Sequence, residues 1–216
     1  MTASIVILIS GRGSNMEAIV NAVSAGKIAG KVTAVIANKP DAAGLNFAKK
    51  AGIDSICVDH NQYENRESFE AALIKRIDAY QPTVVALAGF MRILTPHFIN
   101  HYEGRLLNIH PSLLPAFPGL NTHRRVLEAG VKWHGCTVHF ITETLDCGPI
   151  IIQAAVPVLP DDDEHLLSQR VLTMEHQIYP QAISWFVNEQ LSIEKDCVRI
   201  KDDKEAQFRS YQFEQQ

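Results

Sequence analysis

Apolar runs alternate along the first half of the chain with segments whose apolar residues recur at helical spacing. The runs predict strands at residues 4–9, 32–37, 53–58, 83–88 and 106–109. The segments between them predict helices over residues 14–25, 43–51 and 65–80, and Thr95-Pro96 predicts the start of a further short helix. Strands that are apolar on both faces and alternate with helices are typical of a parallel sheet covered on both sides.

The pattern changes after Gly135. Residues 136–141 and 150–158 read as two strands joined by a short loop containing Asp-Cys-Gly-Pro, which predicts an antiparallel hairpin. A long helix over residues 162–188 is expected to cover it, and the chain becomes polar beyond Glu194. We therefore predict a single-domain, Rossmann-like α/β three-layer sandwich, with a mostly parallel sheet and a C-terminal antiparallel hairpin. The expected domain is residues 1–195, followed by a polar, loosely attached tail at residues 196–216.

Composition narrows the choice of partners. The chain has 216 residues, a formal net charge of −4 and no concentrated basic run, which disfavours nucleic-acid binding. The apolar run near the N-terminus is too short to span a membrane, and the four cysteines form no CxxC pair. We expect a cytoplasmic protein, monomeric or homodimeric, whose partners are small molecules and include neither nucleic acid nor membrane.

The first loop, Ser-Gly-Arg-Gly-Ser-Asn at residues 10–15, joins a buried strand to a helix. Backbone N–H groups at such a helix start can bind phosphate without any cationic side chain. A tight turn with Ser14 or Asn15 as the helix N-cap is the plainer alternative. Met16 stands where a dinucleotide motif has its third glycine, and no acidic residue ends the second strand, so a phosphomonoester fits better. Arg66 is a candidate second clamp, although an ordinary solvated arginine would look the same in the sequence.

The stretch Leu-Leu-Asn-Ile-His-Pro-Ser at residues 106–112 combines a strand with two polar side chains at its end. Asn108 and His110 alternate in that strand, so both point to the same side, at the sheet edge where parallel α/β proteins bind ligands. An amide donor beside an imidazole can hold an oxyanion and exchange a proton. Asp146, at the tip of the hairpin, is the candidate partner that favours the charged imidazole, unless it only bonds its own turn.

The spacing of the remaining histidines does not indicate a metal site. His134 and His139 lie five apart on a strand and face opposite sides, and His97 and His101 have no further ligand at suitable spacing. We therefore expect no metal.

Four motifs occur in the order found in one enzyme family: residues 10–15, Ala-Gly-Phe-Met-Arg-Ile-Leu at 88–94, Asn-Ile-His-Pro-Ser-Leu-Leu-Pro at 108–115 and Leu-Asp-Cys-Gly-Pro-Ile at 145–150. The chain thereby resembles the phosphoribosylglycinamide formyltransferases, from the first strand to at least Pro180. The resemblance implies direct transfer of a formyl group from 10-formyltetrahydrofolate, a co-substrate, to the amine of glycinamide ribonucleotide in purine biosynthesis.

The resemblance also implies roles for individual residues. Asn108 and His110 should stabilise the tetrahedral oxyanion, with His110 as proton donor, and Asp146 should hold the imidazole charged. The residues implied for the ribonucleotide are Gly13, Ser14, Asn15, Arg66 and Glu175. Those implied for the folate are Met91, Arg92, Ile93 and Leu94, together with Asn108 and Asp146.

Alternatives remain open at this stage. A non-catalytic nucleotide- or folate-binding protein would need the glycine loop but not Asn108, His110 and Asp146 together. A formyltetrahydrofolate hydrolase of the same superfamily would be expected to carry an extra N-terminal domain. Asn121 stands where many bacterial members of the family have histidine, and Cys147 receives no role.

Overall fold

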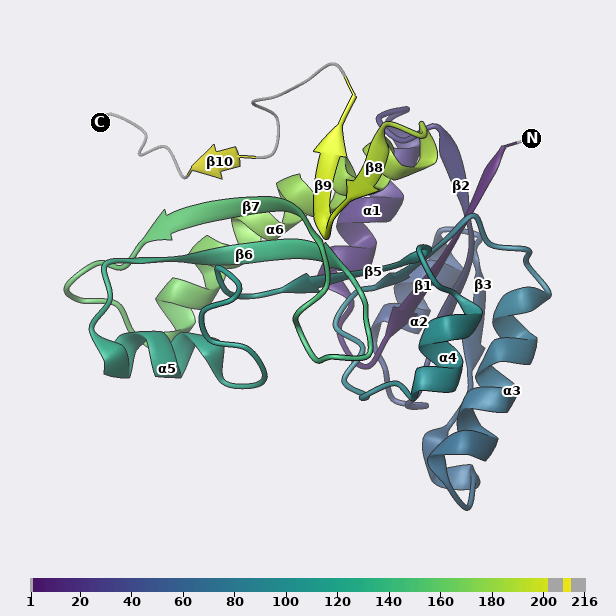
Figure 1. Cartoon of the computed structure of the whole chain (residues 1–216). Coiled ribbons are helices and arrows are strands. Elements are labelled where there is room, and N and C mark those ends of the chain that lie inside the picture. Colours follow the sequence, from purple (N-terminus) through teal and green to yellow (C-terminus); the bar gives the residue numbers. More distant parts are fainter. Residues whose placement is uncertain (1, 202–207, 211–216) are drawn as a thin grey trace.

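The computed structural model describes residues 2–201 and 208–210, which form one eight-stranded sheet with helices on both faces and a small two-stranded sheet (Figure 1). The order of strands across the large sheet is β10-β7-β6-β5-β4-β1-β2-β3. Its strands are β1 (Ala3–Ile9), β2 (Gly30–Ala37), β3 (Asp54–Cys57), β4 (Val84–Leu87), β5 (Leu106–His110), β6 (Trp133–Phe140), β7 (Ile150–Pro157) and β10 (Phe208–Ser210); the small sheet is β8 (Leu191–Glu194) and β9 (Cys197–Ile200). The helices are α1 (Ser14–Ser24), α2 (Gly44–Lys50), the 3-10 turn η1 (His60–Gln62), α3 (Arg66–Asp78), α4 (Pro96–His101), α5 (Thr122–Ala129) and α6 (Glu164–Val187).

The sheet is parallel from β3 to β5 and antiparallel where the β6–β7 hairpin is added to β5. This confirms the predicted Rossmann-like fold with its hairpin. β1 lies between β2 and β4, so the connections from β1 and from β4 leave the sheet in opposite directions. Ligands of open α/β sheets bind at such a switch point, beyond the carboxyl ends of the strands.

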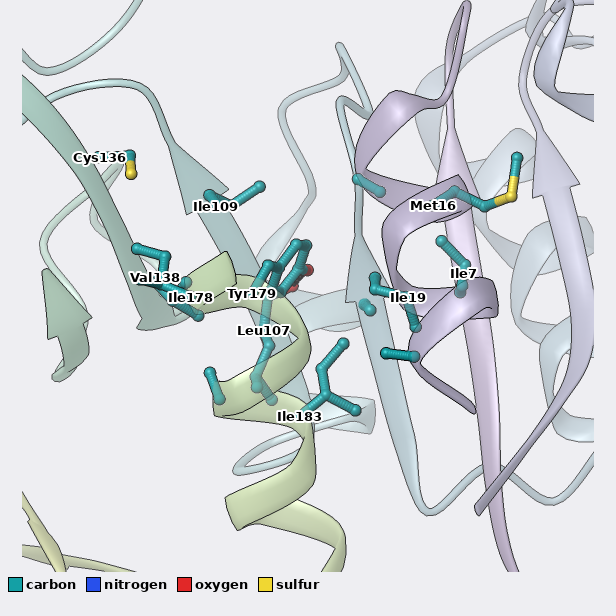
Figure 2. Close-up of a cluster of buried hydrophobic side chains, with 14 of the residues drawn as sticks. Ile7, Met16, Ile19, Leu107, Ile109, Cys136, Val138, Ile178, Tyr179 and Ile183 are labelled. Carbon is teal, nitrogen blue, oxygen red and sulfur yellow. Dashed lines mark hydrogen bonds between the residues drawn. The ribbon is translucent and has the colours of Figure 1, made fainter. Parts of the chain in front are cut away.

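Apolar side chains bury both faces of the sheet. One face of the sheet carries the odd-numbered residues of β1 and is covered by α1 and by α6, which lies against β6 and β7. Figure 2 shows Met16 and Ile19 of α1 near Ile7, with Tyr179 of α6 beside Leu107 of β5. On the other face α3 and α4 pack over the even-numbered residues Val6 and Leu8. This alternation is the period of two that a strand imposes on its side chains.

Local sequence signals fix where several helices begin. Asn65 and Ser68 form a capping box at α3, and the Asp163 side chain accepts a hydrogen bond from the Leu166 N–H at α6. Thr95 caps α4 ahead of Pro96, as predicted. Its hydroxyl and its N–H also donate to the buried carboxylate of Glu70 on α3, which fixes the chain just before α4.

Four features were not predicted: the 3-10 turn η1, helix α5, the β8–β9 hairpin and strand β10. Val198 and Ile200 of β9 are buried in the main core, so loose attachment is wrong for residues 197–200. The expected boundary at residue 195 falls in the turn of this hairpin. Residues 202–207 and 211–216 of the predicted tail lie outside the described residues. In the described part of the chain, no helix has both the length and the apolar character that a membrane span requires.

Substitution of Tyr179 tests how α6 is attached to β4 and β5. This side chain is fully buried, and its Oη lies 3.0 Å from the carbonyl oxygens of both Leu87 in β4 and Leu107 in β5. Tyr179→Phe removes the donor and leaves strand carbonyls without it, so we expect the free energy of unfolding to fall by about 1–3 kcal/mol. Urea denaturation measures this loss.

Tyr80→Phe is the matched control, since the Tyr80 hydroxyl donates to Asp54 in an exposed contact. We expect it to change the unfolding free energy by less than about 0.5 kcal/mol. Equal effects of the two substitutions would contradict the role given to the Tyr179 hydroxyl.

Candidate active site

A pocket of about 240 Å³ lies at the predicted phosphate loop. Its walls come from residues 10–15 after β1, from residues 88, 89 and 91 after β4, and from Lys39 after β2. Gly13 is the N-cap of α1, with a φ of 77°, and no side chain caps the helix. The alternative in which Ser14 or Asn15 caps α1 is therefore wrong. The N-terminus of α1 therefore has no side-chain cap beside the pocket, and uncapped N–H groups at a helix N-terminus can bind an anion with the aid of the helix dipole.

Asn15 and Glu175, predicted separately for the ribonucleotide, lie in direct contact. Asn15 Nδ2 donates to Glu175 Oε2 over 2.6 Å, joining α1 to α6 across 160 residues of sequence. Both residues are buried, and Asn15 Oδ1 has no hydrogen-bond partner among the described residues. Burial raises the pKa of Glu175, and the hydrogen bond from Asn15 opposes that shift. The pair therefore offers polar atoms beside the pocket that a ligand could satisfy.

The cationic side chains that line the pocket do not include Arg66, the one that the sequence predicted. Arg66 is exposed at the first position of α3 and is not among the residues that line the pocket. Arg12 and Lys39 do line it. Lys39 was missed, although it lies two residues beyond the end of the second strand, near the place where a dinucleotide-binding protein has its acid.

Asn108, His110 and Asp146 meet at the carboxyl end of β5. The Nδ1 atom of His110 lies 3.6 Å from Asp146 Oδ2, and both side chains are more than nine-tenths buried. Asp146 Oδ2 also accepts a hydrogen bond of 2.8 Å from the N–H of Gly119. The aspartate therefore binds a distant loop and an imidazole, and the alternative that it merely bonds its own turn is wrong. His110 Nε2 lies 3.1 Å from the carbonyl oxygen of Phe117, a partner that the sequence did not reveal.

The loop that carries Asp146 has two backbone constraints. Asp146 adopts a left-handed conformation with a φ of 53°, which is uncommon for a residue with a side chain. A Cβ at Gly148 would lie 1.8 Å from the carbonyl oxygen of Phe140, so only glycine fits against β6 at this point. The close approach turns the chain back onto the strand and aims the Asp146 side chain at β5.

The predicted folate segment, residues 91–94, lies beside the phosphate loop. The Ser10 hydroxyl accepts from the Met91 N–H over 2.7 Å and donates to Asn38 over 2.6 Å. Met91 and Ile93 are 68% and 62% exposed, as expected for side chains that meet a ligand, whereas Leu94 is buried in the core between α3 and the sheet. Arg92 lies over the ring of Phe69, 5.7 Å from its centroid.

Both histidines of β6, His134 and His139, are buried. His134 Nε2 lies 3.1 Å from His123 Nδ1, and burial lowers the pKa of His134 to about 4. His139 contacts Asn108 and was not recognised as part of the site. His97 and His101 are exposed. Within residues 2–201 and 208–210, no group of three or more His, Cys, Asp and Glu side chains could hold a metal ion.

A profile of the formyl transferase family matches residues 3–183, and the chain belongs to this family. Within the family, the chain is 53% identical over 194 residues to the phosphoribosylglycinamide formyltransferase of Escherichia coli (strain K12), covering 90% of this chain and 92% of that protein. A solved structure of glycinamide ribonucleotide transformylase 1 from Symbiobacterium toebii matches with a TM-score of 0.91 and 49% identity, over 93% of this chain and 95% of that one. The trifunctional purine biosynthetic protein adenosine-3 of Drosophila melanogaster is 48% identical over 186 residues, which are 85% of this chain and only 14% of that protein. These findings confirm the resemblance.

The buried Glu175 carboxylate predicts a pH-dependent stability. Because burial raises its pKa in the folded protein, the stability that Glu175 contributes is present at low pH and is lost as pH rises through that pKa. Glu175→Gln replaces the ionisable group with a neutral one of similar shape. We expect the variant to unfold at a higher denaturant concentration than the wild type at about pH 8, and no such gain near pH 4, where carboxyl groups approach protonation.

Glu64→Gln, at an exposed loop position, is the control and should leave the unfolding midpoint unchanged at both pH values. If Glu175→Gln is no more stable than the wild type at pH 8, then the burial of the ionised Glu175 carboxylate does not destabilise the folded protein, and the prediction is wrong.

Proposed function

We propose that this chain transfers a formyl group from 10-formyltetrahydrofolate to the amine of 5-phosphoribosylglycinamide, as a cytoplasmic enzyme of purine biosynthesis that acts as a monomer or homodimer. The observation that carries the proposal is the buried His110–Asp146 pair beside Asn108, at the same sheet edge as the open N-terminus of α1. In this proposal a phosphate site and an acid–base site lie along one edge of the sheet. Relatives of this chain carry the corresponding name.

In the proposed reaction, the amine nitrogen of the ribonucleotide attacks the formyl carbon on the folate nitrogen. A carbon–nitrogen bond forms, and the electron pair of the carbonyl moves to oxygen to give a tetrahedral oxyanion. The Asn108 amide donates a hydrogen bond to that oxygen, at the end of β5. The oxyanion then collapses, the bond to the folate nitrogen breaks, and a proton passes from the attacking amine to the leaving nitrogen.

His110 has the contacts of a group that carries a proton through this sequence. A proton on Nε2 points at the Phe117 carbonyl oxygen, and a proton on Nδ1 points at the Asp146 carboxylate. Each ring nitrogen of His110 therefore faces an oxygen acceptor, and the Asp146 carboxylate lies against the Nδ1 side of the ring. We propose that the Nε2–H of His110 donates to the oxyanion in place of the Phe117 carbonyl when substrate is bound, and that Asp146 assists the proton transfer.

Two binding regions flank this centre. We propose that the ribonucleotide phosphate binds the N–H groups of Gly13, Ser14 and Asn15, with Lys39 and Arg12 supplying charge. Glu175 accepts hydrogen bonds from the same substrate, while Arg66, exposed on α3, would have to reach in from outside the pocket. The folate region consists of Met91, Arg92, Ile93 and Leu94, whose backbone groups form hydrogen bonds with the edge of the pterin ring.

An assay of tetrahydrofolate release tests the proposed function. Purified protein is mixed with 10-formyltetrahydrofolate, with and without the ribonucleotide. Release only when the ribonucleotide is present is the expected result. Release without it would identify a hydrolase, and no release under either condition would favour a protein that binds nucleotide or folate without reaction.

Asn108→Ala tests the oxyanion donor. Removing one preorganised donor typically costs about 10²–10³ in kcat, and we expect a loss of that size. The KM for the ribonucleotide should change little, because the phosphate binds at the far loop. Asn100→Ala, an exposed site on α4 whose amide contacts Glu143, is the matched control and should retain full kcat. A kcat for Asn108→Ala within a few fold of the wild type would exclude the assigned role.

A further inference from the structure

His139 of β6 lies between two of the proposed catalytic side chains. Its side chain is only 2% exposed. Its Nε2 atom is 3.2 Å from Asn108 Nδ2 and 4.0 Å from Asp146 Oδ1. Its Nδ1 atom is 2.8 Å from the carbonyl oxygen of Phe140. Every polar atom of this ring is therefore directed at a defined group.

These contacts determine which ring nitrogen carries the proton. A carbonyl oxygen can only accept, so Nδ1 must be the donor to Phe140. An amide Nδ2 can only donate, so Nε2 must accept from Asn108 through its lone pair. The ring is thus neutral, and burial, the largest influence, lowers the pKa of His139, against the opposing effects of the Phe140 carbonyl and Asp146.

The neutral ring in turn fixes the amide of Asn108. A reversed amide would place Oδ1 against the Nε2 lone pair, and two acceptors would repel each other. One N–H of Asn108 is therefore held by His139, and the second N–H remains as a donor of fixed direction. A preorganised donor is what stabilises an oxyanion, because nothing must reorganise during the reaction.

A charged His139 would undo this arrangement. Its Nε2–H would no longer accept from Asn108 and would instead point toward Asp146 Oδ1, 4.0 Å away. The Asp146 carboxylate would then be shared between the His139 ring and the His110 ring. Keeping His139 neutral reserves the charge of Asp146 for His110.

We propose that His139 is a positioning residue for formyl transfer, which acts as a neutral acceptor that orients the Asn108 amide. This inference rests on the proposed function, because it assigns His139 a role through Asn108. It does not require His139 to touch either substrate.

Two substitutions separate positioning from simple structural support. His139→Gln can place Oε1 near the position of Nε2 and so retain an acceptor for Asn108, but it loses the donor to Phe140. His139→Asn can retain the donor to Phe140, but it does not reach Asn108. If His139 positions Asn108, His139→Asn should lower kcat by roughly tenfold to a hundredfold, with KM values within about twofold of the wild type. His139→Gln should recover a large part of that loss in kcat. The reverse ranking would overturn the proposal.

A double-mutant cycle with Asn108→Ala gives the sharper test. If His139 acts through Asn108, adding His139→Asn to Asn108→Ala should cause little further loss of kcat. Additive losses in kcat would overturn the positioning role. An inactive wild type would instead overturn the proposed function, so the two failures are distinguishable.

A measurement on the unmodified protein covers the case in which a variant does not fold. In ¹⁵N NMR of labelled imidazoles near neutral pH, His139 should show a protonated Nδ1 and an unprotonated Nε2. A protonated Nε2 would contradict the proposal without reference to any variant.

Discussion

The site depends on placing one carboxylate, that of Asp146, in a nearly dry position at the end of β5. A buried charge is costly unless hydrogen bonds and opposite charges surround it. Here the Gly119 N–H donates to Oδ2, and His110 Nδ1 lies 3.6 Å from the same oxygen. The carboxylate is thus held by the loop after β5 and by the strand itself. Any change in either would leave it unsatisfied.

Contacts of Thr137 and the close packing of Gly148 help to hold the Asp146 carboxylate in this position. The buried hydroxyl of Thr137 donates to the Ser112 carbonyl and accepts from the N–H of Leu114 and the side chain of Gln153. It thereby attaches the loop after His110 to the β6–β7 hairpin that carries Asp146. Gly148 permits the hairpin loop to lie against β6. The two sides of the site are consequently parts of one packed unit, which is what a preorganised acid–base pair requires.

The sequence predicted most of the sheet because its strands are apolar on both faces, and Thr95-Pro96 marked the start of α4. Asn108, His110 and Asp146 were singled out because two polar residues end an apolar strand and a third lies at a hairpin tip. Partners that act through the backbone could not be found in this way, since the Phe117 carbonyl and the Gly119 N–H depend on the path of a loop. His139 was set aside because its register opposite Asn108 follows from strand pairing, not from spacing along the chain. The packing of residues 197–200 was missed because a short polar hairpin with two apolar residues resembles a solvated tail.

The central claim, that the Asp146 charge organises the reaction centre, is tested most directly by the kcat of Asp146→Asn at saturating substrates. The amide keeps the size of the side chain and can still accept from the Gly119 N–H, but it removes the charge that faces His110. The account predicts a loss of kcat of about 10²-fold or more, the scale of a lost electrostatic partner in a preorganised site. A folded variant with kcat within a few fold of the wild type would contradict it.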